Sequence, residues 1–374
     1  MKIAYLLGAL RRGGTETLML DVFRNAQCVD YQFIGIHRKD GEHKAAFYAS
    51  GQKLYKIAPR FPFDPVYLYR LRKALKIEQI DIVHAQQTLD TLYAWIATAG
   101  LKIKIVQTFH GFDCFNKKSK LLSFTAKRTD RNLFVSNYLR EYYTKKYRLN
   151  PQKQQTVYNG ISFEKFDKSY STPDFLQQAG KDGLRISMIG NFVHVREHAS
   201  VCRFLKLLKE KKVKGKISLN FNFYFVGLRL ANQAYLYDDC VKYCEENDLM
   251  DCVHFVGGRD DVPAILQNID AFIYSTDHDT FGIAVVEAIA CKIPTFVNDF
   301  EVMKEITENG KCATIYKTKN ENDLLEKFLL FLQNQNLYKE NAKNAAKIVR
   351  EKYSIETFMA NLAKEYFDLK KKDS

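Results

Sequence analysis

The feature that most constrains the fold is a regular alternation of short β-branched or aromatic runs with longer helical patterns. In the first half of the chain, strands are predicted over 3–7, 31–37, 53–57, 80–85, 104–109, 132–136 and 156–159. Helices are predicted between several of them, over 15–25, 65–76, 88–98 and 137–147. Strands that alternate with helices are typical of parallel sheets covered on both faces, so the pattern predicts an α/β fold.

The same alternation starts again after Gly183. A second series of strands is predicted over 184–190, 220–227, 253–257, 271–275, 294–297 and 312–316. The last helix, over about 355–370, has Phe358, Leu362 and Phe367 on its apolar stripe. Two such series in 374 residues, more than one core usually holds, predict two Rossmann-like domains with doubly wound parallel sheets. The polar, turn-rich stretch before Gly183 predicts a first domain over 1–165, a linker over 166–183 and a second domain over 184–354.

Composition excludes several classes of protein. Apolar residues make up 46% of the chain and charged residues 27%, as in globular rather than disordered proteins. The eight cysteines are scattered without a CxxC pair, so neither a disulfide framework nor a zinc site is indicated. The apolar run at the start ends in Arg11-Arg12 without a cleavage site, and no segment approaches the roughly 18 apolar residues of a membrane span. A cytoplasmic location is expected.

A glycine-rich turn follows the first predicted strand. Gly13 and Gly14 precede the helix predicted from Thr15. Glycines at such a junction let the backbone approach an anion, which also experiences the dipole of the helix N-terminus. The spacing is neither GxGxxG nor that of a P-loop, so a glycine turn that merely starts a helix is the alternative.

A stronger motif joins a predicted strand to a predicted helix through a polar turn. It contains Asp279, Thr280, Phe281, Gly282, Ile283, Ala284 and Glu287. The free N–H groups near Gly282 would receive a phosphate. Glu287, about one and a half turns into the helix, would reach hydroxyl groups of the same ligand. Two carboxylates around one anion-binding helix start suit a nucleotide sugar, which has both a diphosphate and hydroxyls.

With these motifs the chain resembles the retaining glycosyltransferases of family 4 (glycosyl transferases group 1), which have the GT-B fold. Their signature E-x-F-G-x-x-x-x-E-A corresponds to Asp279-Thr280-Phe281-Gly282 followed by Glu287-Ala288, with Asp279 in place of the first glutamate. Further matching segments are Gly13-Gly14-Thr15-Glu16, Asp81-Ile82-Val83-His84-Ala85, Thr108-Phe109-His110-Gly111, Val135-Ser136, Tyr158-Asn159-Gly160-Ile161 and Val256-Gly257-Gly258-Arg259. The resemblance implies two lobes that face a cleft, with the C-terminal helix, 355–374, crossing back to the first lobe.

The phosphate clamp of the family is altered in this chain. Members commonly have G-R-L-x-x-x-K-G after the first strand of the second lobe, where this chain has Gly190-Asn191-Phe192-Val193-His194-Val195-Arg196. Arg196 falls on the clamp lysine and keeps the positive charge, whereas Asn191 replaces the arginine with a neutral donor. The resemblance therefore implies a diphosphate clamp centred on Arg196.

The resemblance also implies the reaction and the residues that perform it. Such enzymes transfer a sugar from a nucleoside-diphosphate sugar by front-face attack, so the protein stabilises the departing diphosphate and orients the acceptor hydroxyl. Catalytic roles are implied for His110, Arg196, Asp279 and Glu287. Donor binding is implied for Gly13, Gly14, Asn191, Arg196, Val256, Gly257, Gly258, Arg259, Asp279, Thr280, Phe281, Gly282, Ile283, Ala284 and Glu287. Glu287 would bind ribose and Asp279 the sugar, UDP is favoured over GDP, and no further cofactor is expected.

Asp277-x-Asp279 also fits the DxD motif of the other major glycosyltransferase architecture, which holds a divalent cation beneath the diphosphate. Because Asp279 stands directly before Thr280-Phe281-Gly282 of the family 4 signature, we interpret the match to the DxD motif as coincidental. No metal requirement is expected.

The formal net charge of +14 comes from the first half of the chain, where residues 1–165 include 28 basic and 13 acidic side chains. Residues 117–148 alone include ten basic side chains and two acidic ones, interleaved with leucine, phenylalanine and tyrosine. A patch that binds a membrane or the acceptor is predicted from Lys117, Lys118, Lys120, Lys127, Arg128, Arg131, Lys145 and Lys146. Such a stretch suits an anionic membrane surface, with a solvated helix face as the alternative. Nucleic acid is not expected, because no known nucleic-acid-binding fold accompanies the charge.

The sequence thus predicts a metal-independent retaining glycosyltransferase at the inner face of a bacterial plasma membrane. Its expected acceptor is a glycan or a lipid-linked glycan, such as one on polyprenyl diphosphate, in the synthesis of capsule or lipopolysaccharide. Because Asp279 and Asn191 depart from the family pattern, a non-catalytic nucleotide-sugar binder is an alternative. A sugar-nucleotide epimerase or phosphorylase on the same architecture is another.

Overall fold

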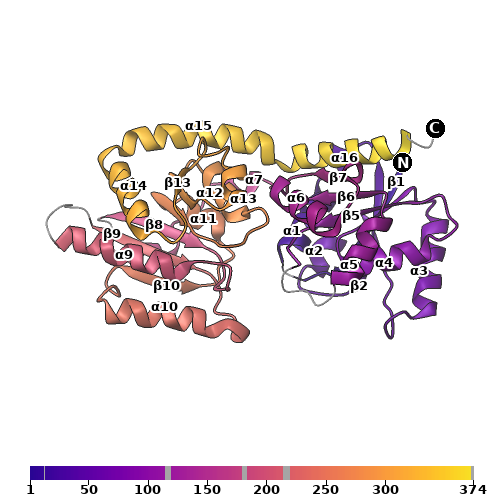
Figure 1. The fold of residues 1–374 in the computed structure, drawn as a ribbon, viewed down its shortest axis with the longest axis horizontal. Helices are drawn as coiled ribbons and strands as arrows, with labels where there is room; N and C mark the ends of the chain where they lie inside the picture. Colours follow the sequence, from indigo (N-terminus) through magenta and orange to yellow (C-terminus); the bar gives the residue numbers. More distant parts are fainter. Residues whose placement is uncertain (12, 114–118, 179–182, 214–219, 372–374) are drawn as a thin grey trace. The chain divides into compact units, whose positions relative to one another are not determined.

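The computed structural model describes residues 1–11, 13–113, 119–178, 183–213 and 220–371. The chain forms two compact units, one of Met1–Ser162 with Tyr353–Ser374 and the other of Phe163–Lys352. Each unit is built on one parallel β-sheet with helices around it (Figure 1). These two parallel-sheet lobes confirm the predicted α/β fold class.

The first unit contains a seven-stranded sheet in the order β3-β2-β1-β4-β5-β6-β7, in which all neighbouring strands are parallel. Its strands are β1 (Lys2–Ala9), β2 (Gln32–Lys39), β3 (Lys53–Lys56), β4 (Ile82–Ala85), β5 (Lys104–Phe109), β6 (Arg131–Phe134) and β7 (Gln154–Thr156). Its helices are α1 (Gly14–Arg24), η1 (Ala26–Cys28), α2 (Lys44–Tyr48), α3 (Pro65–Ile77), α4 (Thr88–Ala97), α5 (Ser119–Arg128), α6 (Asn137–Tyr147), η2 (Pro151–Lys153) and α16 (Ile355–Lys371). The strand order reverses between β1 and β4, where the carboxyl ends of doubly wound sheets bind ligands.

The alternation of side chains along β1 builds both cores of the first unit. Ile3, Tyr5 and Leu7 point to the face covered by α1 and α16, whereas Ala4 and Leu6 point to the face covered by α3 and α4. A strand buried on both faces has this continuous apolar pattern, which explains why the first run of the sequence reads as uniformly apolar.

Helix α16 completes the first core, as the resemblance implied for the C-terminal helix. Phe358, Leu362, Tyr366 and Leu369 are buried there, at spacings of three and four residues. The predicted stripe was wrong at Phe367, which is 40% exposed. One residue beyond Tyr366, its side chain is turned about 100° away from the buried face.

The second unit contains a six-stranded parallel sheet in the order β10-β9-β8-β11-β12-β13. Its strands are β8 (Leu184–Ile189), β9 (Phe221–Val226), β10 (Val253–Gly257), β11 (Ala271–Tyr274), β12 (Thr295–Asn298) and β13 (Thr314–Tyr316). Its helices are α7 (Glu164–Asp167), α8 (Asp174–Gln178), α9 (His198–Val213), η3 (Ala231–Gln233), α10 (Ala234–Glu246), α11 (Val262–Leu266), α12 (Ile283–Ala290), α13 (Glu301–Ile306), α14 (Glu321–Gln333) and α15 (Gln335–Tyr353). One face of the sheet packs on α9, α10 and α14 in a core that also buries Cys202, Cys240, Cys244 and Cys252.

The boundary between the units differs from the prediction. It lies between Ser162 and Phe163. The second unit begins with α7, which overlaps the start of the stretch 166–183 that was expected to be a linker, and continues with α8, which lies within that stretch. Phe166 and Leu176 are both buried, which fixes this polar segment on the second unit. Gln267 strengthens the attachment, because its amide Nε2 donates to the Phe166 carbonyl at 2.9 Å.

Candidate active site

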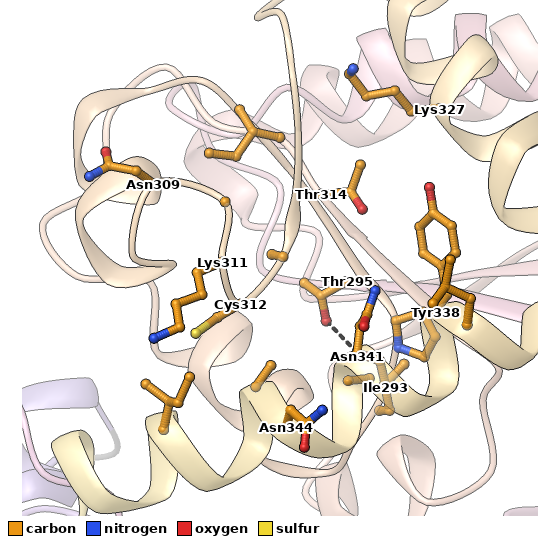
Figure 2. Close-up of a pocket in the computed structure, with 18 residues that line it drawn as sticks. Ile293, Thr295, Asn309, Lys311, Cys312, Thr314, Lys327, Tyr338, Asn341 and Asn344 are labelled. Carbon is orange, nitrogen blue, oxygen red and sulfur yellow. Dashed lines mark hydrogen bonds between the residues drawn. The ribbon is translucent and has the colours of Figure 1, made fainter.

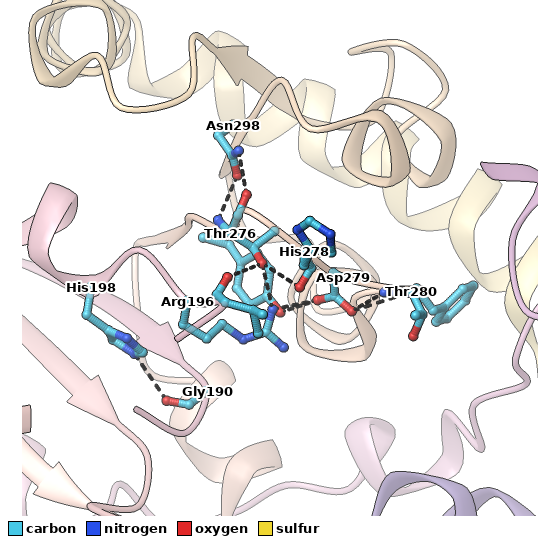
Figure 3. A network of polar contacts seen from close by, with 11 residues as sticks. Gly190, Arg196, His198, Thr276, His278, Asp279, Thr280 and Asn298 are labelled. Atoms are coloured by element: carbon cyan, nitrogen blue, oxygen red, sulfur yellow. Dashed lines mark hydrogen bonds and ion pairs between the residues drawn. The ribbon is translucent and has the colours of Figure 1, made fainter. Parts of the chain in front are cut away.

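Two loops meet at the carboxyl edge of the second sheet. One follows β8 and contains Arg196, and the other follows β11 and contains Thr276. Arg196 and Thr276 form an isolated antiparallel bridge, and the Asp277 N–H donates to the Val195 carbonyl at 3.0 Å. Asn298, at the end of β12, donates to the Thr276 carbonyl and accepts from its N–H (Figure 3). The carboxyl ends of three strands therefore hold one rigid polar site.

Arg196 and Asp279 form a largely buried ion pair at the centre of this site. Arg196 Nη1 donates to Asp279 Oδ2 at 2.6 Å and to Thr276 Oγ1 at 3.2 Å (Figure 3). The Tyr274 hydroxyl donates to the same Asp279 oxygen at 2.6 Å, and the Arg196 guanidinium lies 4.6 Å from the centre of the Tyr274 ring. Burial raises the pKa of Asp279, but the charge of Arg196 and the hydrogen bond from Tyr274 outweigh it and lower the pKa below its usual value. The site thus holds a fixed charge pair at neutral pH.

One hydrogen-bond donor of Arg196, its Nε, is not used by the residues that the structure describes. This nitrogen is buried. A Cβ at position 190 would lie 3.3 Å from this Nε, tighter than most real contacts, so Gly190 leaves room for the arginine. The unpartnered donor is a group that an anion could reach after a small side-chain shift.

Asp279 also shapes the start of α12. Its Oδ1 accepts from the backbone N–H groups of Thr280 and Phe281, at 2.7 and 3.3 Å. Gly282 then adopts φ +82°, where a Cβ would approach Met303 Cε to 2.8 Å. This left-handed turn needs glycine. It leaves the first N–H groups of the helix, those of Ile283 and Ala284, without acceptors inside the helix.

Glu287 has a partner that the sequence analysis missed. Lys165 of α7 lies 3.2 Å from Glu287 Oε1, although the two are 122 residues apart. The carboxylate side chain is only 12% exposed. Because α7 was assigned to the first domain and the linker, nothing in the sequence placed Lys165 beside the motif. Tyr274 was missed as well, and the signal that would have found it is a hydroxyl at the end of a buried strand.

The segment predicted to seat the nucleotide base lies at the end of β10. The Gly257 carbonyl accepts from the Gly227 N–H at 2.9 Å, and a Cβ at Gly258 would lie 2.4 Å from Leu228. At this edge, next to Val256, the backbone of Gly257 therefore pairs with that of Gly227, and Gly258 leaves room for the Leu228 side chain. Arg259 has both its Nε and an Nη on the carboxylate of Asp261, at 2.8 and 2.6 Å.

Asn191, predicted as a donor-binding residue, serves the local loop in this structure. Its Oδ1 accepts from the Leu228 N–H at 2.9 Å, which ties the loop after β8 to the loop after β9. The side-chain amide nitrogen is the group that the residue can offer to a ligand.

The predicted residues of the first unit lie at the carboxyl ends of its own strands. Gly13 precedes α1 with an extended backbone, and its carbonyl accepts from the Thr17 N–H at 2.8 Å, while Gly14 is the exposed first residue of the helix. His110 follows β5, and its Nε2 lies 2.8 Å from Gln86 Oε1. Burial lowers the pKa of His110 to about 4, so its imidazole is neutral at pH 7.

His110 and Gln86 line a pocket of about 520 Å³ in the first unit. The neutral polar side chains around it are those of Thr15, Gln86, Gln87, Thr88, Gln107, Thr108 and His110. Gln86 Nε2 and Gln107 Oε1 are buried without a partner among the described residues. Arg38 also lines the pocket, but its charge is matched by the buried Asp90, whose Oδ1 lies 2.7 Å from Arg38 Nε.

His84 of β4 is buried between Tyr366 and Thr108, with distances of 2.5 Å from Nδ1 and 2.7 Å from Nε2 to their hydroxyls. Burial lowers its pKa to about 3, against about 6.5 in an unfolded chain. Between these values only the unfolded state binds the proton, so the free energy of unfolding of the first unit should fall as the pH falls below about 6.5. From pH 7 to pH 5, we expect His84 to contribute a loss of up to about 2 kcal/mol.

Trp95 is the single tryptophan and lies in the first unit, so its fluorescence can follow urea unfolding of that unit. The control is His84→Gln, which is expected to have a shallower dependence on pH. Equal pH dependence in the two proteins would contradict the assignment.

The predicted basic patch is only partly present. Lys120, Lys127, Arg128 and Lys145 are exposed, and Lys117 and Lys118 lie outside the described residues. Lys146 is exposed as well, but its charge is paired with the buried Asp113 at 2.8 Å, beside the Tyr142 and Tyr147 hydroxyls. Arg131 was wrongly assigned to the patch, because it is 5% exposed on β6, and its Nε lies 3.3 Å from Glu365 of α16.

The two carboxylates of the DxD-like pair have different cationic partners. Asp277 Oδ2 lies 2.6 Å from Lys319 Nζ, whereas Asp279 pairs with Arg196. Over the part of the chain that the structure describes, no group of three or more histidine, cysteine, aspartate or glutamate side chains is arranged to hold a metal ion. None of the helices described is both long and apolar enough to cross a membrane.

The second unit also has a pocket, which lies away from the network around Arg196 and Asp279 (Figure 2). It has a volume of about 620 Å³, and its lining includes Ile293 and Thr295 at the start of β12, Thr314 at the start of β13, and Asn341 of α15. It therefore lies at the amino ends of strands whose carboxyl ends carry the site. Ligands of doubly wound sheets bind at the carboxyl ends.

Comparisons with known proteins agree with this architecture. Residues 12–165 match the family model described as Glycosyltransferase Family 4, and residues 174–348 match the one described as Glycosyl transferases group 1. N-acetyl-alpha-D-glucosaminyl L-malate synthase of Bacillus anthracis is 23% identical over 335 residues, which cover 85% of this chain and 83% of that protein. The N,N'-diacetylbacillosaminyl-diphospho-undecaprenol alpha-1,3-N-acetylgalactosaminyltransferase of Campylobacter jejuni is 39% identical over 94 residues, 25% of each chain. The crystal structure of Anabaena Alr3699/HepE in complex with UDP is similar with a TM-score of 0.84 at 15% identity, covering 98% of this chain and 100% of that one.

Proposed function

Because this chain belongs to the glycosyl transferases group 1, with a family 4 N-terminal lobe and the GT-B fold, we propose that it transfers a sugar with retention from a UDP-sugar to a lipid-linked glycan. The observation that carries the proposal is the buried Arg196–Asp279 pair at the start of α12. It places a cation with an unpartnered Nε, two helix N–H groups and a carboxylate in one site. A diphosphate and the hydroxyls of a sugar need these groups.

Each donor-binding role follows from the position of the side chain. Arg196 and the N–H groups of Ile283 and Ala284 stabilise the diphosphate, and Asp279 accepts hydrogen bonds from the sugar. Glu287, held by Lys165, accepts from the ribose hydroxyls. The glycine-rich end of β10 seats the uracil base through its backbone. UDP is preferred to GDP because the similar Anabaena structure is described in complex with UDP.

The transfer step needs no reactant besides donor and acceptor. The bond between the anomeric carbon and the oxygen of the β-phosphate breaks, and the acceptor oxygen bonds to that carbon on the same face. The proton of the acceptor hydroxyl passes to the departing phosphate oxygen. The protein lowers the barrier by stabilising charge on the diphosphate and by holding both partners in place.

A sugar hydroxyl is the proposed acceptor, rather than a carboxylic acid such as malate. The pocket beside His110 offers amide and hydroxyl groups, and Arg38, the one cation among the described residues that line it, is already paired with Asp90. Among the described residues of this lining, a carboxylate would therefore find no unpaired cation, whereas hydroxyls can both donate to and accept from the glutamine side chains. The name of the Campylobacter relative specifies a sugar on diphospho-undecaprenol, which supports a lipid-linked acceptor in bacterial surface polysaccharide synthesis, such as capsule or lipopolysaccharide.

The test is donor binding followed by release of UDP. We expect one UDP-sugar to raise the melting temperature of the protein and to be hydrolysed slowly, at a rate that EDTA leaves unchanged because Asp277 and Asp279 already have cationic partners. Glu287→Gln should weaken donor binding by about tenfold or more, the effect of losing a hydrogen bond to a charged group. Glu246→Gln, on the exposed side of α10, is the matched control.

The outcomes separate the alternatives. Stabilisation without release of UDP would indicate a non-catalytic binder, and conversion of the sugar nucleotide without release would indicate an epimerase. Loss of activity in EDTA that manganese restores would contradict metal independence.

A further inference from the structure

Exposed apolar side chains of the first unit are concentrated around α3. Of the fifteen large apolar side chains that are exposed among the described residues, five lie within 61–77. They are Phe61 (56% exposed), Phe63 (56%), Val66 (45%), Tyr69 (66%) and Ile77 (65%). The α3 surface is defined here as these five side chains together with Arg60, Arg70 and Lys73.

Helix α3 does not need this surface for folding. Its inner face buries Tyr67, Leu71 and Leu75, which recur every four residues and pack in the core beside α4. The outer face presents Tyr69 and Lys73, at the same spacing, to solvent. A helix that already buries one complete stripe gains no stability from large apolar groups on the other.

The loop before α3 is held in a fixed conformation by Asp64. The Asp64 side chain is buried and accepts from the backbone N–H groups of Arg60, at 3.0 Å, and Val66, at 2.9 Å. Between them Phe63 adopts φ +62°, which is costly for a residue with a bulky side chain. The loop therefore holds Phe63 more than half exposed at an energetic cost, with the ring edge-on to that of Tyr93 at 6.4 Å between ring centres, which points to a function for its exposure.

All accessible charges of the α3 surface are positive. Residues 60–77 include five basic side chains and a single carboxylate, the buried Asp64. Arg70 and Lys73 form no ion pair with any carboxylate in the part of the chain described. On the neighbouring helices, Arg128 of α5 lies 5.5 Å from the ring of Trp95 of α4, which adds a cation and a half-exposed aromatic ring to this side of the unit.

We propose that the α3 surface docks the protein on an anionic membrane. Phe61, Phe63 and Tyr69 enter the head-group region, and the cations lie over the lipid phosphates. Uncompensated positive charge beside aromatic groups matches such a lipid surface, where each lysine or arginine adds about tenfold or less to binding at low salt. The proposal rests on the proposed function in placing a lipid-linked acceptor at that membrane, and it replaces 117–148 as the main contact.

Vesicle flotation tests the proposal with the full chain. Wild type should float with vesicles of phosphatidylglycerol and phosphatidylethanolamine at low salt, and much less with phosphatidylcholine alone. Phe63→Gly should reduce flotation several-fold and change the melting temperature little, because glycine accepts φ +62° without steric cost, which offsets the lost ring contact with Tyr93. Arg70→Glu with Lys73→Glu should reduce flotation at least tenfold.

The control is an equal charge reversal elsewhere in the same unit, Lys145→Glu with Arg148→Glu at the exposed end of α6, which should retain most of the flotation. Hydrolysis of the UDP-sugar should be unchanged in Phe63→Gly, so a failure of the docking proposal is distinguished from a failure of the proposed activity. Wild type that does not float, or a loss of flotation greater in the control than in the α3 variants, would overturn the proposal. Equal flotation with both kinds of vesicle would also overturn it. So would retention of flotation by both α3 variants, which would leave a protein partner for that surface.

Discussion

Sugar transfer by the Arg196→Met protein is expected to be about 10²–10³ times slower than by the wild type, the usual effect of removing a group that stabilises charge in the transition state. Arg196 pairs with Asp279, whose other oxygen binds the N–H groups just before α12, and its unpartnered Nε is available to the departing diphosphate. Turnover of the UDP-sugar measures the loss. A variant that retains turnover within a factor of three would remove Arg196 from the mechanism.

Arg196→Met is also expected to destabilise the second unit, and this loss of stability must be measured separately from the loss of turnover. Removing one member of a buried ion pair costs about 3–5 kcal/mol, because the other charge stays buried without a partner. Here the remaining group would be Asp279, whose pKa rises once the guanidinium is gone. The double variant Arg196→Met with Asp279→Asn should recover much of the lost melting temperature and none of the turnover. Arg196→Lys keeps the charge and should fall between the single variant and the wild type.

The second large effect is expected at the other end of the chain, where Tyr366→Ala should lower the free energy of unfolding of the first unit by about 3–5 kcal/mol. Tyr366 is completely buried, and its hydroxyl lies 3.1 Å from that of Tyr5 and 2.5 Å from His84 Nδ1. The substitution removes the ring and leaves two buried polar groups short of a partner. Urea unfolding followed by Trp95 fluorescence measures the change in that unit.

Two further variants divide the effect of Tyr366→Ala. Tyr366→Phe keeps the ring and should cost about 1–3 kcal/mol through the lost hydrogen bonds alone. Phe367→Ala removes a similar ring from a side chain that is 40% exposed, and should cost about 1 kcal/mol or less. A larger loss for Phe367→Ala than for Tyr366→Ala would mean that α16 presents a different face to the core.

Local patterns predicted the sheets well. Strand β5 (Lys104–Phe109) and helix α6 (Asn137–Tyr147) have the predicted bounds, because each is a continuous run with clear ends. On the amphipathic helix α16 the local pattern does not distinguish the buried Tyr366 from the exposed Phe367. Tyr366 and Phe367 are both aromatic, and only the partner Tyr5, 361 residues away, decides which of them is buried.

The candidate site was predicted only in part, for the same physical reason. The turn and helix start around Asp279 could be predicted from the sequence, because backbone geometry at a helix start restricts which residues can occupy neighbouring positions, as at Gly282. The pairs Arg196–Asp279 and Lys165–Glu287 join residues 83 and 122 positions apart, and no local pattern records which cation meets which carboxylate. Arg131 was misplaced because a charge run contains no information on which of its members belongs to a buried strand.

The discontinuous first unit has a consequence for synthesis of the protein. Its core includes Phe358, Leu362 and Tyr366 of α16, so the ribosome must synthesise that helix before the core can close. The second unit, Phe163–Lys352, is continuous and is fully synthesised earlier. The usual order, in which the N-terminal domain folds first, is therefore reversed. Until that helix docks, the nascent first lobe exposes the apolar side chains that α16 later covers, a surface of the kind that chaperones bind, for as long as the second lobe is being translated.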